Sequence, residues 1–170
     1  MKIMLVEYDA GWVKMFEGEC GLLVGCLGDS VAGIEHVGST AVVGLVSKPI
    51  IDIMVGLVDF SVADSLVSGI VNMGYTYFPE YEDVMPDRRF FKKSVNGTAT
   101  HHVHMTEIDS KFWQRHLLFR DYLRVNPGTA EEYALLKKEL AKREWEDSND
   151  FATAKTEFIR RVEEQARKYA

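Results

Sequence analysis

The segments IEHVGST at residues 34–40 and SKPIIDIMV at residues 47–55 decide the fold. The first segment completes a strand, and Gly38 breaks that strand and opens a short turn or helix. Residues 50–58 form a nearly continuous apolar run rich in β-branched side chains, which is typical of a central strand covered on both faces. Asp52 is the one charged residue in this run. A buried carboxylate is unfavourable without a partner, so Asp52 is a candidate functional residue.

The turn after the first strand has the composition of a small anion site. Gly38 lets a phosphate approach the backbone, and the Ser39 hydroxyl and the free N–H groups of the turn, with Thr40, donate hydrogen bonds to it. A carboxylate at Asp52 would then hold a divalent cation against that phosphate. The alternative is an ordinary turn followed by a structural aspartate whose partner is Lys48 or a histidine.

A second pattern of ligand-type residues lies near the end of the predicted sheet. His102 and His104 alternate on a strand, so both side chains point to one face, and His101 points to the other. Imidazoles at this spacing bind zinc, iron or manganese. With Asp52 they would form a set of two histidines and one carboxylate, with His36 as a fourth neighbour. The alternative is that the two histidines form hydrogen bonds within the sheet or bind a phosphate.

Several cations are candidates for binding a phosphorylated ligand. Lys48 directly precedes the apolar strand, and residues 88–93 contain Arg88, Arg89, Lys92 and Lys93. Alternation places Arg89 on one face of its strand and Arg88 with Lys92 on the other, so these charges cannot all serve one site. Arg89 and Lys92 are favoured because both match the family described below, and the alternative is a solvated edge strand protected by charge. Arg120 is a further candidate on a predicted helix.

Periodicity and turn residues predict an α+β fold, a mixed sheet with flanking helices and a C-terminal helical segment. The Asn96-Gly97 pair indicates a hairpin. Residues 1–170 are expected to form one domain, with a sheet core over about 1–108 and helices over about 109–170. Helices are predicted at residues 9–26, 61–73, 109–125, 128–146 and 149–168, and strands at residues 31–37, 50–58, 75–78, 88–95 and 100–107.

Composition excludes several classes of protein. The chain of 170 residues is 46% apolar and 11% aromatic, which excludes a disordered chain, and no apolar run approaches the length of a membrane span. The net charge of −6 divides into −7 over residues 1–108 and +1 over residues 109–170. This balance makes nucleic acid an unlikely partner and favours a small-molecule ligand. The start has no secretory signal pattern, so a cytoplasmic location is expected, and the oligomeric state stays open.

The chain also resembles a known family. A Gly-Ser pair, a short helix and a strand with Asp-hydrophobic-Asp form the signature of the nucleotidyltransferase superfamily, and residues 38–54 match part of it. More closely, nearly the whole chain is similar to the GrpB family of small bacterial proteins. The block from EHVGST to KPIIDI is the most specific match, followed by RFFK at residues 89–92, HHVH at 101–104 and LFRDYLR at 118–124. The resemblance implies a nucleotidyltransferase-like fold without a settled reaction, and related domains occur fused to dephospho-coenzyme A kinases.

Met54 departs from the superfamily signature, because it stands where the second metal-binding carboxylate is expected. A thioether is a poor ligand for Mg²⁺. The resemblance implies a protein that binds a nucleotide or another phosphorylated small molecule, with Asp52 as the catalytic residue and Mg²⁺ or Mn²⁺ as cofactor. The alternatives are a noncatalytic binding module that lost the second carboxylate, and a metal-binding protein that uses His102, His104 and Asp52 with zinc.

Overall fold

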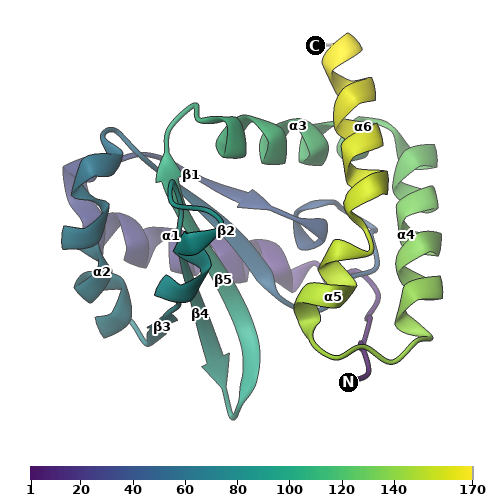
Figure 1. Ribbon diagram of the computed structural model, residues 1–170, viewed down its shortest axis with the longest axis horizontal. Coiled ribbons are helices and arrows are strands. Elements are labelled where there is room, and N and C mark those ends of the chain that lie inside the picture. Colours follow the sequence, from purple (N-terminus) through teal and green to yellow (C-terminus); the bar gives the residue numbers. More distant parts are fainter. Residues whose placement is uncertain (170) are drawn as a thin grey trace.

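The computed structural model describes residues 1–169 and contains a mixed sheet of five strands in the order β1-β2-β5-β4-β3. The central pair β2 and β5 is parallel, and the other neighbours are antiparallel. Figure 1 shows this sheet crossing the middle of the molecule. The strands are β1 (Val31–Val37), β2 (Ile51–Leu57), β3 (Tyr75–Tyr77), β4 (Arg89–Val95) and β5 (Thr98–Glu107).

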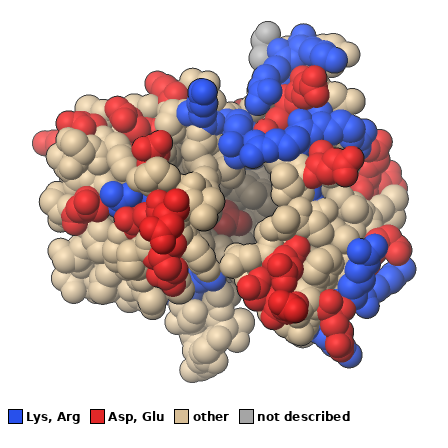
Figure 2. Space-filling model, viewed as in Figure 1, with Lys and Arg blue, Asp and Glu red and all other residues tan. Residues whose placement is uncertain are grey.

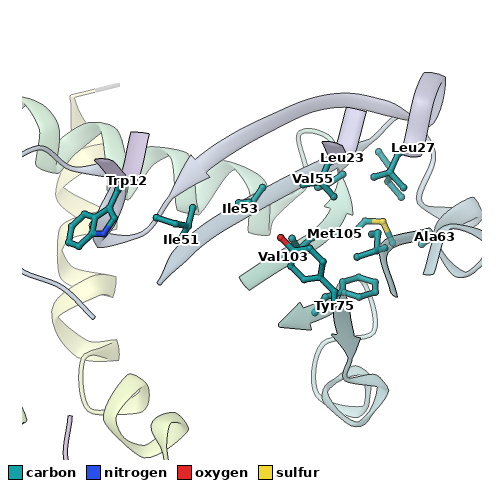
Figure 3. Packing of buried hydrophobic residues seen from close by; sticks show 13 residues of the cluster. Trp12, Leu23, Leu27, Ile51, Ile53, Val55, Ala63, Tyr75, Val103 and Met105 are labelled. Carbon is teal, nitrogen blue, oxygen red and sulfur yellow. The ribbon is translucent and has the colours of Figure 1, made fainter. Parts of the chain in front are cut away.

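Helices cover the sheet on both faces, as expected for this α+β fold. The helices α1 and α2 form the main core with one face (Figure 3), and α3 packs through Trp113 against Val37 and Met54 on the other. The C-terminal helices lie together at one side of the sheet (Figure 1). In the part of the chain that the structure describes, the α-helices are α1 (Gly11–Leu27), α2 (Ala63–Asn72), α3 (Lys111–Val125), α4 (Pro127–Ala141), α5 (Ser148–Thr153) and α6 (Thr156–Lys168).

Strand alternation explains why one face of the sheet can hold a polar site. The side chains of Ile51, Ile53 and Val55 enter the core under α1, so Asp52 and Met54 point to the opposite face. In the parallel register, β5 places His102 beside Asp52 and His104 beside Met54. Three polar groups from two central strands therefore share one face.

The predicted helices near the C-terminus need two corrections. The helix expected at residues 128–146 ends at Ala141, and the chain then turns so that Trp145 packs edge-on against Phe151 and donates to the Leu140 carbonyl. The helix expected at residues 149–168 is two helices, with a break at Lys155. The break exists because α5 buries Phe151 in the cluster with Leu140, whereas α6 buries Val162 in a different cluster beside α3 and α4.

None of the helices within residues 1–169 is long and apolar enough to span a membrane. The change from sheet to helices falls between the end of β5 at Glu107 and the start of α3 at Lys111.

Candidate functional site

The turn after β1 packs directly on Asp52. Gly38 has φ +74°, a conformation that favours glycine, and a Cβ added there would lie 2.7 Å from Asp52 Oδ2. The residues that follow, Ser39–Ala41, form a single 3₁₀ turn, which is too short to supply a helix dipole. The contribution of this turn to an anion site therefore rests on the Ser39 hydroxyl.

Two imidazoles hold the Asp52 carboxylate. His102 Nδ1 lies 3.4 Å and His104 Nε2 lies 3.3 Å from Asp52 Oδ1, and the Asp52 side chain is 30% exposed. Burial opposes ionisation, but the hydrogen bonds and charges of the two histidines hold the pKa of Asp52 far below its usual range. Asp52 is therefore ionised at all ordinary pH values.

The contact at Nδ1 of His104 shows which of its two ring nitrogens carries the proton. The Arg88 guanidinium lies 3.3 Å from His104 Nδ1, and because arginine only donates, Nδ1 accepts and Nε2 donates to Asp52. A histidine that binds a metal through Nε2 normally donates from Nδ1 instead. Burial also lowers the pKa of His104, which favours the neutral ring. His104 is thus arranged as a hydrogen-bond donor rather than as a metal ligand.

The histidine-rich metal centre considered from the sequence does not fit this arrangement. Within residues 1–169 no group of three histidine, cysteine or acidic side chains is arranged to hold a metal ion. A single ionised carboxylate at Asp52, with Oδ2 beside Gly38, fits instead the way Mg²⁺ is held by one carboxylate together with the phosphates of a ligand.

His36 and Thr40 lie outside this cluster. In the sheet His36 pairs with Ile53, so its ring points away from the Asp52 face and stacks on Phe16 at a centroid distance of 4.9 Å. His36 Nε2 donates to Thr40 Oγ1 over 2.9 Å, and Thr40 Oγ1 donates to the Ile50 carbonyl over 3.2 Å. Burial lowers the pKa of His36 to about 4. Both residues fix the turn, and the structure brings neither to Asp52.

Three lysines from separate segments converge on a cavity of about 200 Å³ beside Asp52 and Ser39. Lys48 precedes β2, Lys137 lies on α4, and Lys155 lies at the break between α5 and α6. Figure 2 shows a hollow in the middle of this face of the molecule, with an acidic side chain visible inside it and basic side chains above it in the region of α3 and α6.

Lys137 is the most unusual of the three lysines. Its side chain is 2% exposed, and its ammonium donates to Ser39 Oγ over 2.8 Å and to the Val46 carbonyl. Neither partner is charged. Burial, together with the charge of Lys155, lowers the pKa of Lys137 to about 7.

The other two lysines are held at the cavity by an aromatic ring. The ammonium groups of Lys48 and Lys155 lie 5.5 Å and 4.7 Å from the Phe151 ring centroid. Burial lowers the pKa of both, and the charge of Lys155 lowers that of Lys48 further. Their positive charges therefore repel one another within a partly desolvated space.

Two of the arginines predicted as phosphate ligands are engaged elsewhere. Arg89 points to the opposite face of the sheet, where it pairs with Asp64 at 2.8 Å and Glu82 at 3.3 Å. Arg120 pairs with Glu35 at 2.6 Å and Asp121 at 2.8 Å. Arg120 lines a separate cavity of about 810 Å³. The structure brings neither arginine to Asp52.

Lys92 lies on the same face as Asp52, opposite His102 in the register of β4 and β5. Its ammonium lies 5.0 Å and 5.6 Å from the ring centroids of Phe78 and Phe90. Lys92 therefore adds positive charge near the site without a contact to Asp52.

Sequence reasoning missed Lys137 and Lys155. Lys137 follows the buried Tyr133 by one helical turn and precedes the buried Leu140, a spacing that marks a lysine on the inner face of α4. No comparable signal exists for Lys155, because its place depends on the break between α5 and α6.

Comparison with known proteins identifies the family. The family model of the GrpB protein matches residues 2–165. The chain belongs to the GrpB family. It is 36% identical over 168 residues to UPF0157 protein YqkA of Bacillus subtilis, covering 99% of this chain and 48% of that protein, so it spans about half the length of that relative. It is 27% identical over 176 residues to a dephospho-CoA kinase of Mycobacterium bovis, covering 89% of this chain and 42% of the kinase.

Two solved structures confirm the expected fold. The crystal structure of conserved protein GrpB from Enterococcus faecalis has a TM-score of 0.87 and 36% identity, with 98% of this chain and 99% of that chain covered. Cid1, in complex with the UTP analogue UMPNPP, has a TM-score of 0.54 and 17% identity, with 81% and 43% covered. At that identity the likeness to Cid1 concerns the fold alone, and this GrpB family member has a nucleotidyltransferase-like fold.

Proposed function

We propose that this GrpB family member binds a phosphorylated small molecule, with nucleotides as the favoured class, in the cavity lined by Lys48, Lys137 and Lys155. The observation that carries the proposal is the charge of that cavity. Three ammonium groups surround it, Asp52 is the one carboxylate among its lining residues, and the histidines already engage that carboxylate.

The buried ammonium of Lys137 is the strongest reason to expect an anionic ligand. Removing an ammonium from water is costly unless an anion compensates it, and within residues 1–169 its hydrogen-bond partners are a hydroxyl and a carbonyl. A phosphate in the cavity would supply the missing negative charge to all three lysines and would accept their hydrogen bonds. Ser39, which accepts from Lys137, also lines this cavity, and its hydroxyl can rotate to donate to the same phosphate.

A divalent cation fits the proposal through Asp52. Its ionised carboxylate lies at the edge of the cavity, and one carboxylate plus ligand phosphates is a common environment for Mg²⁺. When bound, such an ion would neutralise phosphate charge and fix the orientation of the phosphates. The complexes of Cid1 with a UTP analogue and with MgATP make nucleoside triphosphates the first ligands to test.

A noncatalytic role has one specific observation in its favour. Met54, at the position of the second carboxylate, is fully buried against Val37 and Trp113 and offers no oxygen ligand. If the site is catalytic, nucleotidyl transfer is the reaction class that its position and charge support, by orientation and charge stabilisation. Turnover assays with the best-binding triphosphate would separate transfer from binding alone.

The test of binding is calorimetric titration of the protein with ATP, GTP, CTP, UTP and inorganic tripolyphosphate, each with and without Mg²⁺. Replacing Lys137 with methionine keeps the bulk and removes the charge, and Lys155→Met does the same at the break between α5 and α6. Each change is expected to weaken binding about tenfold or more, because a charge-assisted hydrogen bond is lost. Lys138→Met is the matched control, because Lys138 is the exposed neighbour on α4.

Asp52→Asn tests the cation separately. This variant should bind the phosphates through the lysines but lose the gain in affinity that Mg²⁺ gives the wild-type protein. No binding of any of these ligands, or equal losses in the Lys137 and Lys138 variants, would contradict the proposed function.

A further inference from the structure

A second cavity opens from the same residues as the lysine cavity. It measures about 330 Å³, and both cavities are lined by Gly38, Ser39, Asp52, Tyr133, Ala152 and Lys155. Beyond these shared residues the two differ, because the second cavity extends between the sheet and the helices α3 and α6 instead of toward α4. The site therefore has two lobes that meet at Asp52.

The second lobe has a different chemistry from the first. Its walls include the apolar side chains Phe119 and Ile159 and the imidazoles of His104 and His116. Its one carboxylate besides Asp52, Glu163, pairs with Arg160 at 3.1 Å and lies 3.6 Å from Arg115. Glu163 therefore balances part of the charge of the two arginines, whereas Lys155, which lines both lobes, has no ion-pair partner among the described residues.

His116 lines this lobe and carries a hydrogen-bond acceptor. Its Nδ1 donates to the Phe112 carbonyl over 2.8 Å, so in the neutral ring Nε2 carries a bare lone pair. Burial lowers the pKa of His116 to about 4, and the neutral ring therefore dominates near neutral pH. Within residues 1–169, Nε2 has no hydrogen-bond partner, and the ring centroid lies 6.3 Å from that of His104.

The acceptor of His116 and the lysines of the first lobe suit different parts of a ligand. A fully ionised phosphoryl group has only acceptor oxygens, so it suits the lysines and cannot donate to Nε2 of the neutral His116 ring. An O–H or N–H group can donate a hydrogen bond to this nitrogen. Apolar walls at Phe119 and Ile159 suit the carbon skeleton that carries such a group.

We propose that the second lobe binds a neutral, hydroxyl-bearing organic group through His116 Nε2, while linked phosphates occupy the lysine lobe and Asp52 lies at the junction. This inference rests on the proposed function and deepens it, because it excludes inorganic polyphosphate as the whole ligand. A ribose attached to the phosphates and a separate alcohol share this chemistry, and the experiment distinguishes them.

The experiment compares two ligands in the same protein variants by titration calorimetry with Mg²⁺: inorganic tripolyphosphate, and the tightest binder among ATP, GTP, CTP and UTP. His116→Phe keeps the stacked contact with Phe112, whose centroid lies 4.0 Å away, and removes the acceptor. It should weaken nucleotide binding about three- to tenfold and leave tripolyphosphate binding unchanged. Ile159→Trp, which fills the lobe, should show the same selectivity even if His116→Phe folds poorly.

Gln114→Phe adds the same ring on the exposed side of α3 and should change neither affinity. In a further arm, the matching nucleoside is titrated into protein saturated with tripolyphosphate. Nucleoside binding that His116→Phe weakens assigns the lobe to a separate alcohol, whereas binding of the triphosphate alone assigns it to the attached ribose, and both support the proposal.

Equal loss of both ligands in the two lobe variants, or no loss of nucleotide in either, would overturn the inference, as would binding of tripolyphosphate without binding of any nucleotide. These outcomes differ from a failure of the proposed function, in which neither ligand binds the wild-type protein.

Discussion

Lys137 carries its charge at a place where the protein supplies no counter-ion. Its pKa of about 7 in the folded protein lies well below the value of about 10.4 in an unfolded chain. Between these two values the unfolded state binds more protons than the folded state, so stability from this group rises as the pH rises from about 7 toward 10. A ligand phosphate favours the charged form and works in the opposite direction.

The pH dependence of stability tests this directly. Between pH 7 and pH 9, wild-type protein should gain up to about 2 kcal/mol of unfolding free energy relative to Lys137→Met, because one proton is released per molecule on folding. Urea unfolding of both proteins at several pH values measures the difference, and the other titrating groups cancel in the comparison. Parallel curves for the two proteins would show that Lys137 has an ordinary pKa.

At the residue scale, some of the site follows from the sequence. Asp52 stands out as one charge in an apolar strand, and the alternation of His102 and His104 places them on one face without knowledge of the fold. The choice between metal ligation and hydrogen bonding does not follow, because it depends on Arg88 reaching His104 Nδ1. Only the packing of β4 on β5 determines that contact.

At the scale of elements, the turn between β1 and β2 is the most constrained segment of the site. Gly38 combines a positive φ with a backbone that leaves no room for a Cβ beside Asp52. Gly44 at the end of the same segment has φ +83° but open space around it. Comparing alanine substitutions at Gly38 and Gly44 therefore separates the effect of backbone strain from the effect of the contact with Asp52.

Gly38→Ala should destabilise the protein by about 2 kcal/mol or more and weaken tripolyphosphate binding, because strain and the clash with Asp52 Oδ2 act together. Gly44→Ala should lower the free energy of unfolding by about 1 kcal/mol because of its φ alone, and it should leave ligand binding intact.

Gly21 provides a control of the opposite sign. Gly21→Ala, in an exposed and open position of α1, should stabilise the protein by about 0.5–1 kcal/mol. Thermal unfolding and calorimetry measure all three, and a Gly38→Ala protein that matches Gly44→Ala would exclude the clash.

Strands were more predictable than helices in this chain, for a physical reason. The continuous apolar run at residues 50–58 identifies β2 within one residue of each observed end, the strand predicted at residues 31–37 coincides with β1, and Asn96-Gly97 identifies the hairpin of β4 and β5. The C-terminal end of α4 and the break at Lys155 depend instead on which cluster buries Phe151 and which buries Val162. Those burials involve partners distant in sequence, which local periodicity does not report.

At the scale of the whole molecule, the net charge of the sheet-forming part does not indicate the charge of the site. Residues 1–108 carry a net charge of −7, yet the cavity beside Asp52 is cationic because Lys137 and Lys155 come from the nearly neutral C-terminal part. The site is complete only when the C-terminal helices dock on the sheet. The net charge of a segment therefore does not predict the charge of the ligand that fits this cavity.

A ligand bound between these two parts should stabilise both at once. In the proposed site, tripolyphosphate would contact Ser39 from the turn after β1 and Lys155 from the break between α5 and α6, with a divalent cation between it and Asp52. At about 100 times its dissociation constant it should therefore add about 2.7 kcal/mol to the docked state. Hydrogen exchange should then slow in residues 36–41 and in residues 148–160 together, while the exposed surface of α2 on the other face of the sheet exchanges at its original rate. Lys155→Met should remove the effect at residues 148–160 more than at residues 36–41, because it removes the contact on the helical side. Protection of the sheet segment alone in wild-type protein would show that the C-terminal helices take no part in holding the ligand.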